Sequence, residues 1–126
     1  MSPLRGIRGA VQPPADTAAA IDASTRRLLS EMVERNGVDP RSVTAIWFTQ
    51  TADLTAAHAA TSARALGWRH IPLLGAQEAP VEGQMARVVR ALMIVETDTD
   101  PLSVRHVYLG ATRALRDDLN ENGACE

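Results

Sequence analysis

The sequence contains no lysine, because all 13 of its basic residues are arginines. Schiff-base enzymes, pyridoxal phosphate enzymes and P-loop nucleotide-binding proteins all depend on a lysine amine, so these three classes are excluded. Aromatic residues make up only 3% of the chain. Its core therefore has to be packed by aliphatic side chains and methionine.

Cysteine and histidine are also scarce. The single cysteine, Cys125, is next to last, so it cannot form an intrachain disulfide and is badly placed for a catalytic thiolate. The three histidines, His58, His70 and His106, lie far apart and form no pair at zinc-binding spacing. We therefore expect neither a metal ion nor a cofactor.

The charge and hydropathy patterns exclude two classes of partner. The formal net charge is -2, which leaves no basic excess for neutralising nucleic-acid phosphates. No apolar run approaches the roughly 18 residues that a membrane span needs. Residues 1–10 hold two arginines and no apolar signal core. We expect a cytoplasmic protein that binds neither nucleic acid nor membranes.

The length suits one hydrophobic core. We expect a single domain over residues 1–118 and a flexible polar tail over residues 119–126. The predicted elements, in chain order, are a strand at 4–11, a helix capped by Asp16 and ending near Asn36, a strand at 43–51, a helix capped by Asp53 and running through His58 to Leu66, a short strand at 69–74, a turn at 75–78, a buried strand at 88–95, a helical turn at 101–104 and a strand at 106–110.

This order predicts an α/β fold with a mixed five-stranded sheet and two main helices, each ended by a glycine, Gly37 and Gly67. Two helices can cover only one face of such a sheet. The other face needs a partner, so we expect an oligomer.

Two arginines lie on predicted strands. Arg90 interrupts the apolar run Val88–Val95, where a guanidinium stays charged and needs a carboxylate or an anionic ligand. A structural ion pair and a ligand site are both open readings. Arg8 is flanked by Gly9, which would let a ligand approach, although a solvated surface arginine is the alternative. Arg5 and Arg8 are three residues apart and point to opposite faces of the strand.

Three further residues are candidates on weaker grounds. Tyr108, the only tyrosine, lies on a strand and either packs with its hydroxyl at the rim or holds a ligand. Glu78 follows a predicted strand and turn, as loop-borne site residues and solvated turn residues both do. A lone histidine such as His58 is commonly a surface residue. Together these residues suggest a dianion site of arginines and a tyrosine, without nucleophile, metal or general base.

Short motifs between Arg5 and Asp118 share their order and spacing with a known family. They are RGIRGA (5–10), GW (67–68), IP (71–72), QE (77–78), VR (89–90), TDT (97–99) and RHVYL (105–109). With them the chain resembles the trimeric chorismate mutases, which are distinct from the all-helical ones. The first and last motifs are the most specific, since both stand at family spacing from Arg90.

The resemblance implies a homotrimeric pseudo-α/β barrel with three active sites in the clefts between subunits. It also implies the rearrangement of chorismate to prephenate, in the synthesis of phenylalanine and tyrosine, without a cofactor. By resemblance, Arg90 donates to the ether oxygen of chorismate and to a carboxylate. Arg8 and Tyr108 hold carboxylate groups, and Glu78 binds the ring hydroxyl.

The same resemblance assigns residues to the lining and cover of the cleft. The backbone of the segment after the short strand lines the substrate ring, a neighbouring subunit supplies an arginine near the mouth, and a mobile C-terminal cover completes the site. These residues are Leu73, Leu74, Gly75, Ala76 and Gln77 for the lining, Arg64 for the mouth, and Leu115 and Arg116 for the cover.

Three positions depart from the family pattern. Gly75 stands where the family often has a small polar or thiol side chain. His58 and Thr61 stand where an aromatic residue and a lysine are common, so a cation that would attract the dianion is missing. One residue is also missing between Arg64 and Gly67. We expect these changes to weaken substrate affinity and to leave the catalytic donor in place.

Two other readings stay open. Small imine-deaminase-like proteins share a similar trimeric architecture, and a trimer of this kind could bind small carboxylates without turnover. The chain could also be an interaction domain whose arginines are incidental. Arg90 separates these readings, since rearrangement needs a donor at the ether oxygen and mere carboxylate binding does not.

Overall fold

The computed structural model describes residues 3–119 and contains the predicted mixed five-stranded sheet. The strands are β1 (Leu4–Val11), β2 (Val43–Gln50), β3 (Leu73–Gln77), β4 (Val89–Glu96) and β5 (Val107–Tyr108). Their order across the sheet is β3-β2-β4-β1-β5. β4 runs antiparallel to β1 and β2, whereas β3 is parallel to β2 and β5 is parallel to β1. The apolar strand that carries Arg90 is thus central, as its composition predicts.

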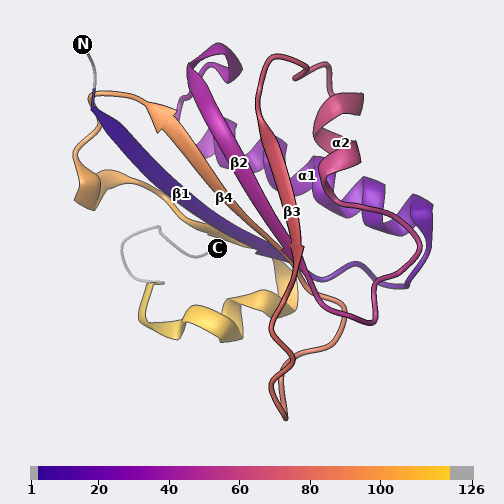
Figure 1. The fold of residues 1–126 in the computed structure, drawn as a ribbon. Helices are drawn as coiled ribbons and strands as arrows, with labels where there is room; N and C mark the ends of the chain where they lie inside the picture. The colour runs from indigo at the N-terminus through magenta and orange to yellow at the C-terminus, as the bar shows by residue number, and fades with distance from the viewer. Residues whose placement is uncertain (1–2, 120–126) are drawn as a thin grey trace.

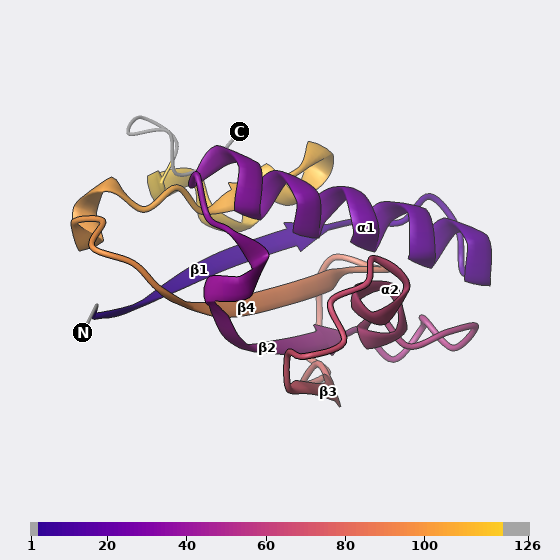
Figure 2. The ribbon, with the colours of Figure 1, turned by 90° about the horizontal axis from the view of Figure 1, so that it is seen from above.

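Two α-helices lie on the same side of this sheet (Figures 1 and 2). They are α1 (Ala18–Arg35) and α2 (Ala60–Ala65). The described chain also contains three 3₁₀ helices, η1 (Pro40–Ser42), η2 (Pro101–Ser103) and η3 (Gly110–Leu119). The buried side chains Ile21, Leu28 and Met32 of α1 pack in one core with Ile7 and Met93 of the sheet. No helix in the described part of the chain is long and apolar enough to cross a membrane.

The start of α1 differs from the prediction. Thr17, not Asp16, is the N-cap, and its side-chain oxygen accepts a hydrogen bond from the Ala20 N–H at 3.1 Å. The Asp16 carboxylate instead accepts hydrogen bonds from the backbone N–H groups of Thr55 and Ala56, at 2.9 and 3.0 Å. The bond from Ala56 is the main reason that the pKa of Asp16 is lowered. Asp16 therefore joins the start of α1 to a loop far along the chain.

The second helix is much shorter than predicted, and His58 lies outside it. Asp53 does not cap a helix, because its carboxylate accepts from the Thr51 hydroxyl at 2.5 Å and from the Arg87 N–H. The side chain of Gln50 forms hydrogen bonds with backbone groups that would pair with one another in a helix. Its amide nitrogen donates to the Leu54 and Ala57 carbonyls at 2.9 Å, and its oxygen accepts from the Ala59 N–H at 3.0 Å. These bonds hold residues 54–59 as a loop.

The edge strands also differ from the prediction. β3 occupies residues 73–77, where a turn was expected, and the expected strand at 69–74 is wrong over most of its length. Small residues have low strand propensity, but pairing of Phe48 with Gly75 and Thr49 with Ala76 overrides it. β5 is shorter than expected and η3, which follows it, was not predicted. Residues 120–126 of the expected flexible tail lie outside the described residues.

The face of the sheet opposite the helices carries large exposed apolar side chains. Leu4, Trp47 and Leu74 are 55%, 44% and 60% exposed. Each alternates along its strand with residues that pack in the core, so all three point to the helix-free side. The expected uncovered face is therefore present, and it is apolar enough to pack against another subunit.

Gly9 allows close packing of the core. A Cβ atom there would lie 2.7 Å from Met32 Sδ, 2.9 Å from Leu28 Cδ1 and 3.2 Å from the Val107 carbonyl oxygen. The close approach expected at this glycine is thus made by α1 and β5.

We predict that Gly9→Ala lowers the free energy of unfolding by about 1–3 kcal/mol, because the added methyl group overpacks two fully buried side chains. Urea unfolding of the purified variant measures this. Gly75→Ala is the matched control, since a Cβ atom there meets nothing within 4 Å. Its effect should stay within about 0.5 kcal/mol. Equal effects of the two substitutions would contradict the packing role of Gly9.

Candidate active site

The register of three strands brings the predicted catalytic residues to one face of the sheet. Arg90 on β4 lies opposite Ala10 on β1 and opposite Thr49 on β2. Tyr108 on β5 also lies beside Ala10. Arg8 is two residues before Ala10, so its side chain points to the same face. That face is the one without α-helices.

These residues line a cavity of about 320 Å³, which we call the Arg90 cavity. It is lined by Arg8, Gly9, Trp47, Thr49, Glu78, Arg90, Ala91, Leu92 and Tyr108. All four residues that the sequence analysis assigned to catalysis therefore lie around one hollow. Arg5 does not line it, and its guanidinium donates instead to the Thr99 carbonyl at 2.8 Å.

Arg90 meets a carboxylate without using its full bonding capacity. Its Nε atom lies 3.3 Å from Glu78 Oε2, and the side chain as a whole is 39% exposed. Nε itself is buried and forms no hydrogen bond with any described residue. The ion pair that the sequence left open is present, but it is an incomplete one. A buried donor of this kind favours a further anionic acceptor.

Tyr108 is held by packing at the side of the Arg90 cavity. It is buried together with Ala10 and Val88, and Leu115 of η3 packs against this cluster. The charge of Arg116 acts on His106, two residues from Tyr108. Within the same chain, Leu115 thus packs beside the tyrosine and Arg116 lies near His106.

The predicted ring-lining segment faces a second cavity of about 290 Å³, which we call the His58 cavity. Gly75, Ala76 and Gln77 line it together with His58 and Phe48. Phe48 belongs to the core, which places this cavity on the helix side of β2 and β3. Within one chain, Gly75 and Gln77 therefore face away from Arg90, whereas Ala76 pairs with Thr49 and points to the same face as Arg90.

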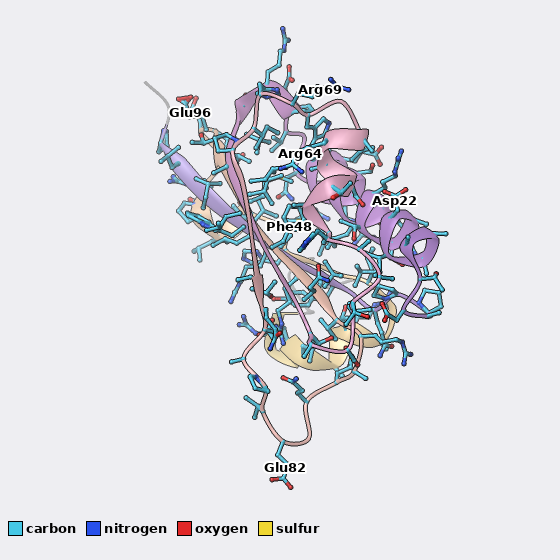
Figure 3. The ribbon with its side chains drawn as sticks, turned by 45° about the vertical axis from the view of Figure 1, so that its right-hand side comes forward. Asp22, Phe48, Arg64, Arg69, Glu82 and Glu96 are labelled. Carbon is cyan, nitrogen blue, oxygen red and sulfur yellow. The ribbon has the colours of Figure 1, made fainter. Side chains whose placement is uncertain are left out.

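Five predicted residues line neither of these two cavities, namely Arg64, Leu73, Leu74, Leu115 and Arg116. Leu73 packs against the core and Leu74 is exposed on the opposite face. Arg64 lies exposed on α2 (Figure 3). The described chain thus divides the predicted site into two groups, and Arg64 stands on the side of the second group.

The sequence analysis missed three side chains of the Arg90 cavity, namely Trp47, Thr49 and Leu92. Alternation along β2 puts Trp47 and Thr49 on one face, a signal that was available from the sequence. Their proximity to Arg90 depends on the strand register, which could not be predicted from the sequence. Thr49 has a specific contact, because its hydroxyl donates to Glu78 Oε2 at 2.5 Å.

His106 supports the backbone of Arg8. The Arg8 N–H donates to His106 Nδ1 at 3.0 Å, so the imidazole takes a hydrogen bond that a longer β5 would supply. Burial lowers the pKa of His106, and the charges of Arg8 and Arg116 lower it further. The ring accepts this bond only while Nδ1 carries no proton.

The described residues include no group of three or more histidine, cysteine, aspartate or glutamate side chains placed to hold a metal ion. The polar groups around the Arg90 cavity are instead two guanidinium groups, two hydroxyls and one carboxylate. Such a set can bind an anion with two carboxylates and orient it.

Comparisons with known proteins agree on one family. The family model described as chorismate mutase type I matches residues 4–119. Chorismate mutase AroH of Thermus thermophilus is 47% identical over 117 residues, covering 92% of this chain and 96% of the relative. Chorismate mutase AroH of Bacillus subtilis is 37% identical over 118 residues, covering 93% of each. A solved chorismate mutase from Clostridium thermocellum aligns with a TM-score of 0.85 and 39% identity, covering 86% of this chain and 97% of that one.

We predict that the free energy of unfolding falls as the pH is lowered from about 7.5 to about 5.5, partly through His106. The pKa of this group in the folded chain lies below its ordinary 6.5, so the unfolded chain binds the proton more readily. The stabilisation is complete above that ordinary value and is lost as the pH falls through the folded pKa.

Urea unfolding at the two pH values tests this with His106→Asn as the comparison. The asparagine oxygen can accept the Arg8 N–H but cannot be protonated. The variant should therefore lose less stability than the natural chain over this pH range. An equal loss in both proteins would show that His106 is not responsible.

Proposed function

The chain belongs to the chorismate mutase type I family, and on that premise we propose that the Arg90 cavity is one part of an active site shared between subunits. The protein is an isomerase that converts chorismate to prephenate in aromatic amino-acid synthesis. We also propose that the protein is cytoplasmic, as expected from the sequence.

The reaction is an intramolecular rearrangement, in which one carbon–oxygen bond breaks as a carbon–carbon bond forms. No nucleophile or proton transfer is required. An enzyme accelerates it by holding the substrate in its compact conformer and by stabilising negative charge that develops on the ether oxygen. A preorganised cation in a partly dry cavity supplies that stabilisation.

Arg90 is the donor that we assign to the ether oxygen. The observation that supports this assignment is its buried Nε, which forms no hydrogen bond with any described residue although a carboxylate is nearby. The backbone of Arg90 is fixed on the central strand by pairing on both sides, which limits the reorganisation needed when the transition state forms. A flexible surface arginine would lack this property.

The other residues of the Arg90 cavity suit the rest of the substrate. Arg8 and Tyr108 can bind the two carboxylates, since a guanidinium offers paired donors and a phenol offers one more. Glu78 can accept a hydrogen bond from the ring hydroxyl through the oxygen that Thr49 does not occupy. The apolar side chains of Trp47 and Leu92 can cover the ring.

We place the remaining part of the site on a neighbouring subunit of a homotrimer. Three features support this: the apolar helix-free face, the position of β3 at the edge of the sheet, and the location of the His58 cavity on the other side. The neighbour would bring Gly75 and Arg64 against the Arg90 cavity. Leu115 and Arg116 of the chain that carries Arg90 would cover it. Site-forming interfaces of this head-to-tail kind close into rings.

The departures from the family pattern lie on the neighbour's part of this arrangement. Gly75 leaves open space, because a Cβ atom there would meet nothing within 4 Å. His58 lines the same cavity. We therefore expect these departures to weaken substrate affinity. The alternative is a trimer that binds carboxylates without turnover, and the next experiment would reveal it.

We predict that Arg90→Ala lowers the turnover of chorismate by about 100- to 1000-fold or more, because the donor to the ether oxygen is lost. The loss of chorismate absorbance in the ultraviolet measures this. Arg41→Ala is the control, since Arg41 is an exposed arginine that pairs only with Asp39 among the described residues. It should be as active as the natural chain. Unchanged turnover in Arg90→Ala would overturn the assignment.

We also predict that mixed trimers of Arg90→Ala and Arg64→Ala chains are more active than either variant alone. If the two arginines of one site come from different subunits, random mixing rebuilds an intact pair in about a quarter of the sites. The two variants are unfolded together, refolded and assayed with chorismate, and each variant refolded alone is the control. Activity no higher than the average of the two controls would place both arginines of a site on one chain.

A further inference from the structure

Thr49 lies between the strand of Arg90 and the strand that leads to Glu78. On β2 it pairs with Arg90 of β4 on one side and with Ala76 of β3 on the other. Its hydroxyl donates to Glu78 Oε2 at 2.5 Å, which is at the short end for a hydroxyl bound to a carboxylate. Thr49 also lines the Arg90 cavity, so this bond is formed within the site.

The same carboxylate oxygen lies near Arg90 without bonding to it. Oε2 is 3.3 Å from Arg90 Nε, and Nε has no hydrogen-bond partner among the described residues. A free carboxylate beside a guanidinium normally forms bonds of about 2.7–2.9 Å, commonly in pairs. Here the oxygen lies closer to the hydroxyl than to the guanidinium.

The main chain of Glu78 is fixed independently of this contact. Its N–H donates to the Gln50 carbonyl at 2.8 Å, which continues the pairing of β2 with β3. The position of the carboxylate relative to Arg90 is therefore decided by side-chain contacts. Among the described residues, the Thr49 hydroxyl provides the only hydrogen bond recorded for this carboxylate.

We propose that Thr49 is a positioning residue whose hydroxyl holds the Glu78 carboxylate away from Arg90, so that the guanidinium stays free for the substrate. This inference rests on the proposed function, which makes Arg90 the donor to the substrate. Without the hydroxyl, Glu78 closes onto Arg90 as a full ion pair. Chorismate then has to displace an internal carboxylate before it can bind, and apparent affinity falls.

The test compares two substitutions at one position. Thr49→Val keeps the shape of the side chain and removes the hydroxyl, while Thr49→Ser keeps the hydroxyl. In steady-state assays with chorismate, Thr49→Val should raise KM by about three- to tenfold, the equivalent of one hydrogen bond. Its kcat should change by less than about twofold, because a bound substrate has already displaced the carboxylate. Thr49→Ser should restore KM to within about twofold of the natural value.

The Glu78→Gln background separates positioning from a general structural effect. A glutamine cannot form an ion pair with Arg90, so adding Thr49→Val there should change KM by less than about twofold. The inference is overturned if Thr49→Val has the natural KM, if Thr49→Ser is as impaired as Thr49→Val, or if Thr49→Val raises KM equally in the Glu78→Gln background. Circular dichroism of each variant checks that the chain is folded.

A failure of the proposed function has a different signature. If Arg90→Ala retains full turnover, the assignment of Arg90 fails whatever Thr49 does. If Arg90→Ala is inactive and the Thr49 variants behave alike, only the positioning role fails. The Thr49, Glu78 and Arg90 contacts are all within one chain.

Discussion

The antiparallel pairing of β4 between β1 and β2 is the constraint on which the site depends. It sets Arg90 beside Thr49 on one strand and beside Ala10 on the other, and Ala10 in turn sets the positions of Arg8 and Tyr108. Side chains alternate along a strand, so a slip of one residue would turn Arg90 into the core and Met93 out of it. The burial of Met93 and Val95 in the core therefore fixes the face on which the arginine lies. The core and the site are selected by the same register.

Side chains, rather than regular secondary structure, organise the loops around this sheet. Gln50 binds the backbone of residues 54–59, Asp16 binds that of Thr55 and Ala56, and Asp53 binds that of Arg87. Arg87 has a positive φ of 52°, and its N–H bond to Asp53 holds this conformation directly before β4 begins. Each of these contacts saturates backbone groups that would otherwise be unpaired near the sheet. The loops beside both cavities are thereby fixed without helix or strand.

Elements with a strong local pattern could be predicted from the sequence, and elements that depend on distant partners could not. The apolar stripe Ile21, Leu28 and Met32 and the stop at Gly37 predicted α1 closely, and the apolar run around Arg90 predicted β4 as the central strand. β3 was placed too early, because small residues such as Gly75 show no strand signal until β2 pairs with them. The second helix was predicted to begin too early, because the Gln50 side chain forms hydrogen bonds with the backbone of residues expected in its first turns. The resemblance, not the local pattern, joined Arg8, Glu78, Arg90 and Tyr108 into one candidate site.

By itself, the sequence indicated a class of chemistry. Its arginines, its one tyrosine and a carboxylate on or beside predicted strands suggested a site that binds and orients a dianion, and the family resemblance supplied the reaction. The sequence also determined that one sheet face would lack a cover, since two helices are too few for both. Only the tertiary structure decided that Thr49 contacts Glu78, that Gly75 faces away from Arg90, and that His106 supports Arg8. These are contacts between residues 29 to 98 positions apart or across a sheet, and strand register and packing select them through the whole core rather than through any local pattern.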